Sequence, residues 1–116
     1  MVFGFNSTPI VESEKVENLI ETGSILIDVR EDDEWIAGHH SKAVHIAMGT
    51  ISDKLDFFDK KNNYIVVCRS GARSAKVTKF LINEGFDASN LDGGMKSFSQ
   101  ISDKIVNSEG QKGQII

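Results

Sequence analysis

The segment 64–75, with the sequence YIVVCRSGARSA, limits the possible folds of this chain more than any other stretch. A short apolar run leads into Cys68, the only cysteine, and a second arginine and a segment with helical periodicity follow. A buried strand, a tight loop and a helix start in direct succession are typical of α/β domains. The segment therefore predicts a loop that holds a thiol at the carboxyl end of a strand.

Strand and helix patterns alternate along the rest of the chain. Apolar runs predict strands at residues 9–11, 25–29, 43–46, 64–67 and 88–91. Helical periodicity predicts helices at residues 13–22, 31–36, 50–58, 74–84 and 95–106, with a capping box formed by Thr50 and Asp53. This alternation predicts an α/β fold with a central, mainly parallel five-stranded sheet and helices on both faces. In such sheets the ligand site lies beyond the carboxyl ends of the strands, where Cys68 is expected.

Length and composition indicate one globular domain. The 116 residues suit a single domain at residues 1–107, followed by a polar, glycine-spaced segment at 108–116 that we expect to be a flexible tail. A net charge of −4 argues against nucleic-acid binding, and a monomer is the default expectation. Residues 1–6 lack the pattern of a secretory signal, no stretch has the length of a membrane span, and a lone cysteine suits a reducing compartment. We therefore expect a cytoplasmic protein that does not contact membranes.

The residues after Cys68 favour a thiolate. A thiol is nucleophilic as the thiolate, and the pKa of a free cysteine is about 8.5. The positive end of the following helix, a turning backbone around Gly71, and the charges of Arg69 and Arg73 should all lower that pKa. A buried structural cysteine is the alternative, but it would need neither the arginines nor the glycine. The loop therefore predicts an anion-binding site beside a nucleophile.

Several motifs together resemble the rhodanese-like sulfurtransferases. They are LIDVRE at 26–31, EWIAGH at 34–39, AVHI at 43–46, IVVCRSGARSA at 65–75, GF at 85–86 and LDGGM at 91–95. The resemblance runs from about residue 10 to residue 100 and implies the rhodanese-like fold. It also implies that Cys68 accepts a sulfane sulfur from a small anionic donor such as thiosulfate, becomes a persulfide, and passes the sulfur to cyanide or a cellular thiol. The implied substrate-binding loop comprises Arg69, Ser70, Gly71, Ala72, Arg73 and Ser74.

The length of the loop separates two chemistries within the resemblance. Rhodanese-like enzymes that handle sulfur have four residues between cysteine and arginine, and related phosphatases and arsenate reductases have five. Cys68 and Arg73 are separated by four, which favours sulfur transfer. No metal or organic cofactor is implied.

A second alternative is a noncatalytic interaction or sulfur-relay module. Retention of the cysteine and both arginines weighs against a noncatalytic role. With a single cysteine, no resolving thiol exists in the chain, so a persulfide on Cys68 must be discharged to another molecule, which includes a partner protein.

The remaining polar candidates have structural interpretations. We expect Asp28 and Arg30 to pair at the end of their strand, and His39 to make a structural hydrogen bond. A metal site at the three histidines lacks ligand spacing, so His39 and His40 are expected to be a solvated pair. The stretch His40-Ser41-Lys42 departs from the turn of the related proteins, and Phe98 stands where they carry tryptophan.

Overall fold

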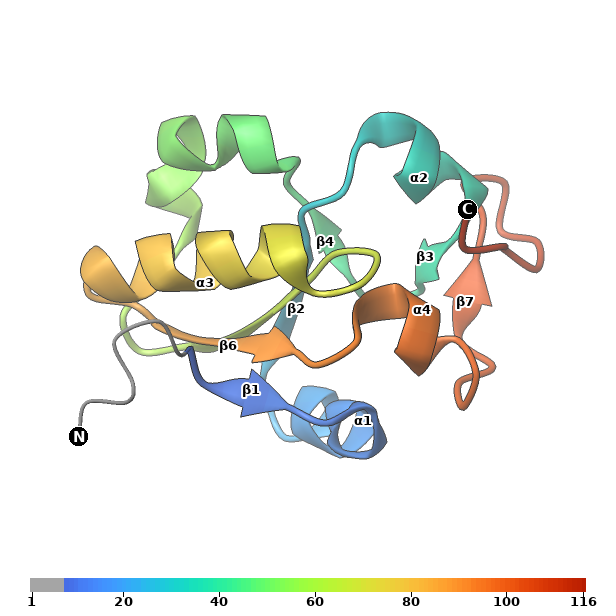
Figure 1. The fold of residues 1–116 in the computed structure, drawn as a ribbon, viewed down its shortest axis with the longest axis horizontal. Coiled ribbons are helices and arrows are strands. Elements are labelled where there is room, and N and C mark those ends of the chain that lie inside the picture. The colour runs from blue at the N-terminus through green and yellow to red at the C-terminus, as the bar shows by residue number, and fades with distance from the viewer. Residues whose placement is uncertain (1–7) are drawn as a thin grey trace.

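A five-stranded, entirely parallel sheet forms the centre of the computed structural model, which describes residues 8–116 (Figure 1). The N-terminal stretch considered for a secretory signal lies outside these residues. The strands occur in the spatial order β1 (Ile10–Val11), β6 (Asp87–Leu91), β5 (Asn63–Val67), β2 (Ile25–Asp28) and β4 (Val44–His45). The predicted α/β fold with a five-stranded sheet is confirmed.

Helices cover both faces of the sheet, as predicted. One face carries α3 (Ala72–Asn83) and the 3₁₀ segment η2 (Met48–Phe57), and the other carries α1 (Ser13–Glu21) and α4 (Gly94–Phe98) (Figure 1). The short α2 (Asp32–Ala37) follows β2 at the carboxyl edge of the sheet. None of the helices within residues 8–116 combines the length and the apolar character that a membrane crossing requires.

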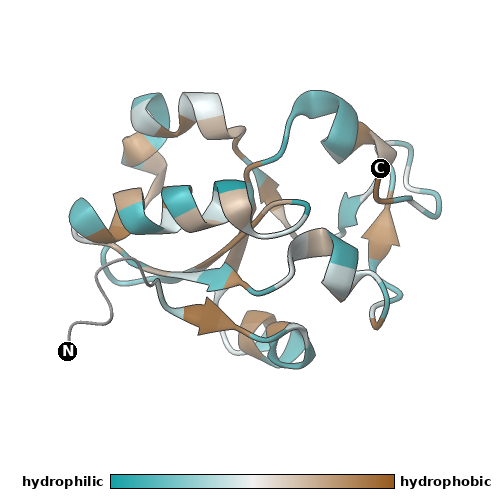
Figure 2. Cartoon of the chain, in the orientation of Figure 1, coloured by the Kyte–Doolittle hydropathy of each residue, from teal (hydrophilic) through white to brown (hydrophobic). Residues whose placement is uncertain are grey.

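The central strands are apolar because both of their faces are buried. On β5, Ile65 belongs to the apolar cluster beneath α1 and α4, and Val66 belongs to the cluster beneath α3 and η2. Successive side chains of a strand point to opposite faces, so a sheet covered on both sides needs continuous apolar runs. In Figure 2 teal and brown segments alternate along α3, as expected of a helix that buries one face against a sheet.

The prediction of a long C-terminal helix is wrong. The helix predicted over 95–106 ends at Phe98, and the chain turns to form β7 (Ile105–Val106), which pairs antiparallel with β3 (His39–His40). Ser102 accepts the Lys104 N–H through its hydroxyl, and such local side-chain bonds compete with helix formation.

The capping box predicted at Thr50 is also absent. The Thr50 hydroxyl donates to the Ala47 carbonyl, and η2 has no side-chain cap. A reciprocal box forms instead between Glu31 and Glu34 at the start of α2. A capping box thus occurs in the structure, but at the start of α2 and not at Thr50.

Residues 108–116, expected from their composition to be a flexible tail, make backbone hydrogen bonds to the domain. The Ser108 and Gln114 N–H groups donate to carbonyls of α2, at 3.1 and 2.8 Å. A methyl group added at Gly113 would come within 2.8 Å of the Gly38 Cα, so two glycines allow the backbones to approach closely. Backbone hydrogen bonds, which composition does not encode, hold this segment against the domain.

Candidate active site

Cys68 is the first residue after β5, at the carboxyl edge of the sheet. Its side chain is buried, with 1% of its surface exposed. Gly71 adopts a φ of +111°, a left-handed conformation that other residues resist, and caps the start of α3. The chain thus turns from strand to helix over four residues, Cys68 to Gly71, and the turn closes around the sulfur.

Hydrogen-bond donors converge on the Cys68 Sγ atom. The Gly71 N–H donates to it over 3.1 Å, and the Ser74 hydroxyl lies 3.2 Å away. Burial raises the pKa of the Cys68 thiol. Hydrogen bonds from the Ser74 hydroxyl and from the backbone N–H groups of Ser74, Gly71 and Ser70 lower it by a larger amount, so the pKa lies below its ordinary value. Hydrogen bonds from the loop and from Ser74 therefore favour the thiolate.

The first residues of α4 hold the loop in this orientation. The Met95 N–H donates to the Cys68 carbonyl over 2.8 Å, and the Lys96 N–H donates to the Arg69 carbonyl over 2.9 Å. A Cβ atom at Gly94 would lie 2.5 Å from the Arg69 carbonyl oxygen, so only glycine permits this approach. The carbonyls of Cys68 and Arg69 thus point toward α4, and the N–H groups of the loop remain available to the sulfur. In the sequence Gly94 stood out only as part of the motif at 91–95, and this support was not predicted.

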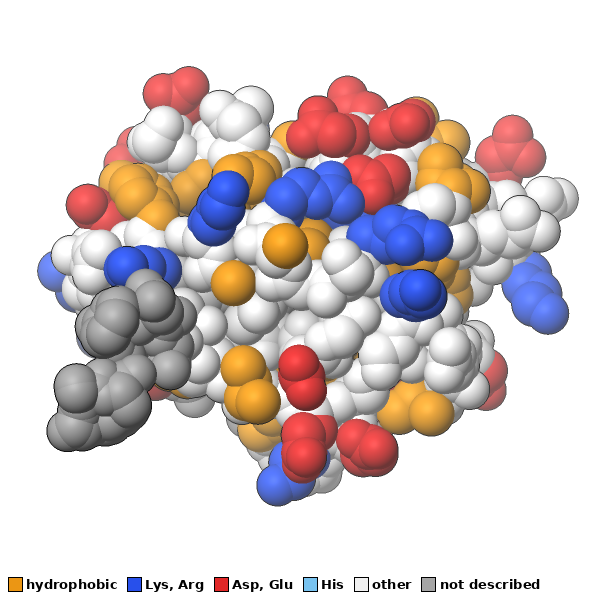
Figure 3. Space-filling model, in the orientation of Figure 1, with side chains coloured by type: hydrophobic (Ala, Val, Ile, Leu, Met, Phe, Trp, Pro, Cys, Tyr) orange, Lys and Arg blue, Asp and Glu red, His pale blue; other side chains and the backbone are white. Residues whose placement is uncertain are grey.

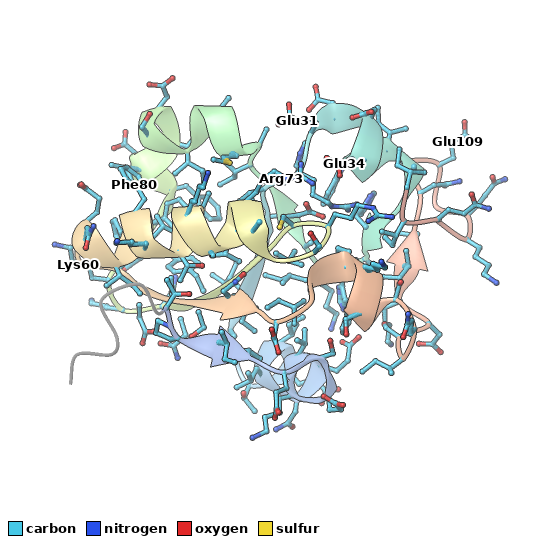
Figure 4. The ribbon with its side chains drawn as sticks, viewed as in Figure 1. Glu31, Glu34, Lys60, Arg73, Phe80 and Glu109 are labelled. Atoms are coloured by element: carbon cyan, nitrogen blue, oxygen red, sulfur yellow. The ribbon has the colours of Figure 1, made fainter. Side chains whose placement is uncertain are left out.

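Arg73 forms a bidentate ion pair with Glu34 of α2 (Figure 4). The two nitrogen–oxygen distances are 2.7 and 2.9 Å. The hydrogen bonds from Arg73 outweigh burial and, together with the Glu31 N–H, lower the pKa of Glu34 to about 2. The same pairing raises the pKa of Arg73. Arg73 therefore links the loop to α2 and has most of its charge matched within the protein.

Arg69 is half-buried and its Nε–H donates to the Ile116 carbonyl over 2.9 Å. Both arginines expected to bind an anionic donor thus have protein partners in this structure. Figure 3 shows basic side chains beside a group of acidic side chains near the position of α2. The acidic group is consistent with the run Asp32, Asp33 and Glu34 in the first turn of α2.

Asn90 is a site residue that sequence reasoning missed. It lies in β6, is buried, and places its Oδ1 atom 2.5 Å from the Ser74 Oγ atom. Its Nδ2 group donates to the Gly71 carbonyl over 3.1 Å. The available signal was an amide near the carboxyl end of the strand predicted at 88–91.

Asp28 and Arg30 support the neighbouring strand end. Their side chains are fully buried and form the expected ion pair, with an Arg30 Nη2 to Asp28 Oδ2 distance of 2.7 Å. The same Nη2 group donates to the Gly38 carbonyl over 2.6 Å. The pair fixes the connection between β2, α2 and β3, and no contact places either side chain on the Cys68 sulfur.

Two histidine rings stack on the indole of Trp35. The His39 ring stacks on it at a centroid distance of 3.6 Å, and the His45 ring stacks at 4.7 Å. His39 Nδ1 is also hydrogen-bonded to the Trp35 carbonyl at 2.6 Å, so it makes the structural bond expected from the sequence. Within residues 8–116, histidine, cysteine and acidic side chains form no group of three that could hold a metal ion.

The prediction of a solvated histidine pair is wrong. His40 is 1% exposed, and its Nε2 atom lies 3.0 Å from a Glu17 carboxylate oxygen. Its Nδ1 atom accepts the Lys42 N–H over 3.0 Å and closes the turn that departs from the related sequences. The altered turn is therefore ordered by a buried histidine.

Comparison with known proteins shows the family of the chain. The profile described as Rhodanese-like domain matches residues 12–101, which is most of the chain. The chain belongs to the rhodanese-like sulfurtransferase family. It is 48% identical over 73 residues to YtwF of Bacillus subtilis (strain 168), covering 63% of this chain and 71% of that protein.

Two further relatives extend the comparison. Over 87 residues the chain is 31% identical to GlpE of Pseudomonas fluorescens (strain SBW25), named as a thiosulfate sulfurtransferase, with 74% of this chain and 80% of GlpE covered. The crystal structure of a rhodanese-like domain protein from Staphylococcus aureus superposes with a TM-score of 0.74 at 36% identity, covering 78% of this chain and 90% of that one.

Proposed function

We propose that this rhodanese-like protein transfers a sulfane sulfur from an anionic donor, such as thiosulfate, to an external thiophilic acceptor through a persulfide on Cys68. The observation that carries the proposal is the compact turn after Cys68. The Gly71 N–H of this turn and the Ser74 hydroxyl at the start of α3 lie 3.1 and 3.2 Å from the sulfur. These groups stabilise the Cys68 thiolate, which attacks the donor and is the leaving group of the second step.

The transfer balances without an added oxidant or reductant. The Cys68 thiolate attacks the outer sulfur of thiosulfate, a sulfur–sulfur bond forms, and sulfite leaves with the electron pair of the bond that breaks. A cyanide ion or a thiolate then attacks the terminal sulfur of the persulfide. The Cys68 thiolate is the leaving group of this second step, so the cycle returns to its starting state.

The loop residues have separate proposed roles. Arg69 is half-buried at the site, and we assign it to the anionic donor, for which it exchanges its contact with the Ile116 carbonyl. Arg73 is bound to Glu34 and acts by holding the loop against α2. Since Cys68 is the only cysteine, the sulfur must leave for a second molecule, either a small acceptor or a partner protein.

A steady-state assay separates this function from phosphatase chemistry. With thiosulfate and cyanide, we expect thiocyanate formation by the wild type and none by Cys68→Ser, which keeps the size of the side chain. Under the same conditions we expect no hydrolysis of an aryl phosphate. Phosphate release that depends on Cys68, without thiocyanate formation, would overturn the proposal.

A further inference from the structure

The hydroxyl of Ser74 lies between two acceptors. Its Oγ atom is 3.2 Å from the Cys68 Sγ atom and 2.5 Å from the Asn90 Oδ1 atom. Ser74 is fully buried, and Asn90 is 7% exposed. A hydroxyl has one proton to donate, so it cannot serve both acceptors at once.

The orientation of the Asn90 amide follows from its second contact. Its nitrogen is 3.1 Å from the Gly71 carbonyl oxygen, which can only accept. The NH₂ group must therefore face Gly71, and the amide oxygen must face Ser74. Exchanging the two ends would place two acceptors against each other, so the amide oxygen is a fixed acceptor for the Ser74 proton.

The two protonation states of Cys68 use this proton differently. In the thiol state the S–H group can donate to Ser74, and Ser74 can donate to Asn90, so each group has a partner. In the thiolate state the Ser74 hydroxyl turns to the sulfur, and the buried Asn90 oxygen loses its donor. A buried acceptor without a donor is unfavourable, so the amide opposes ionisation of the thiol.

We propose that Asn90 is a positioning residue that competes with the Cys68 sulfur for the single hydroxyl proton of Ser74. It thereby limits how readily the thiol ionises, while the donors of the loop favour the thiolate. The proposal rests on the proposed function only in taking Cys68 as the reactive thiol. The new point is that a residue of β6, Asn90, limits the ionisation of the Cys68 thiol through Ser74.

The charged groups near the sulfur are shared by all the variants needed for a test. Arg73 and Glu34 face the loop from α3 and α2 as a pair. The Asp28–Arg30 pair lies at the end of β2, and Arg69 and Lys96 belong to the loop and α4. None of these is altered when Asn90 or Ser74 is replaced by an apolar residue, so a change in thiol acidity reports the hydrogen bonds.

The test is a double-mutant cycle on the pKa of Cys68. Iodoacetamide alkylation rates are measured against pH for the wild type, Asn90→Leu, Ser74→Ala and the double variant. Leucine matches asparagine in size, and the Gly71 carbonyl keeps its bond from the Ala75 N–H. Asn90→Ala is a second route if the leucine variant does not fold, and Ser89→Ala on the same strand is the control, because its side chain points to the other face.

We expect Asn90→Leu to lower the pKa of Cys68 by about one unit and Ser74→Ala to raise it by a similar amount. In the Ser74→Ala background, replacement of Asn90 should leave the pKa unchanged. An unchanged or raised pKa in Asn90→Leu, or equal shifts in both backgrounds, would overturn the proposal. Since alkylation needs no sulfur donor, this outcome is independent of whether thiosulfate loads the wild type.

Discussion

Replacing Glu34 with glutamine isolates the charge that links the active-site loop to α2. The amide oxygen of glutamine can still accept the Glu31 N–H, which Glu34 accepts over 3.1 Å, so the start of α2 keeps its cap. The bidentate contact to Arg73 loses its ionic character and one of its acceptors. We therefore expect Glu34→Gln to destabilise the folded protein and to loosen the Cys68 loop.

The pKa of Glu34 sets the size and the pH range of the effect. A fall from 4.5 to about 2 corresponds to about 3 kcal/mol of stabilisation, and solvent screening at the partly exposed Arg73 reduces this to about 1–2 kcal/mol. Because the folded-state pKa is the lower one, the stabilisation is complete above pH 4.5. It is lost as the pH falls from 4.5 to about 2.

Urea unfolding at several pH values measures this contribution. At pH 7 the free energy of unfolding of Glu34→Gln should be about 1–2 kcal/mol below that of the wild type, and the difference should shrink toward pH 2. Asp33→Asn, an exposed acid of the same helix turn, serves as the control and should change the free energy by a few tenths of a kcal/mol. Equal stabilities of Glu34→Gln and the wild type at pH 7, or a difference that persists unchanged at pH 2, would refute this account of the ion pair.

Three further predictions concern the support of the site. Gly94→Ala should lower the melting temperature and abolish sulfur transfer, because its Cβ would lie 2.5 Å from the Arg69 carbonyl oxygen; wild-type values in thermal unfolding and turnover would contradict this. Arg69→Met should raise the KM for thiosulfate several-fold and leave the alkylation rate of Cys68 within about twofold, and an unchanged KM would remove Arg69 from donor binding. Phe98→Ala should cost about 3–5 kcal/mol in urea unfolding, since the ring is fully buried, and a loss below about 1 kcal/mol would contradict its core role.

The sheet and the position of the thiol could be predicted from the sequence because both depend on local patterns. Apolar runs such as 64–67 identify strands buried on two faces, and the turn at Gly71 follows from its place between strand and helix. The helix predicted after Met95 failed because its apolar pattern continues past Phe98, whereas α4 ends there and Ile105–Val106 pair with β3.

The contacts that tune the thiol could not be predicted in the same way. Asn90 is 22 residues from Cys68 in the sequence, and its approach to Ser74 depends on the pairing of β6 with β5. The partner of Arg73 likewise lies 39 residues away, on α2. Such contacts are set by the register and packing of whole elements, which residue patterns do not specify.

Intact-protein mass spectrometry of a single turnover tests sulfur transfer through Cys68 most directly. After incubation with thiosulfate and removal of the excess donor, the wild type should gain about 32 Da at Cys68. Addition of cyanide should return the original mass and release one equivalent of thiocyanate, while Cys68→Ser should show neither change. A wild-type protein that stays unmodified with thiosulfate, a thiosulfonate and glutathione persulfide would contradict the account.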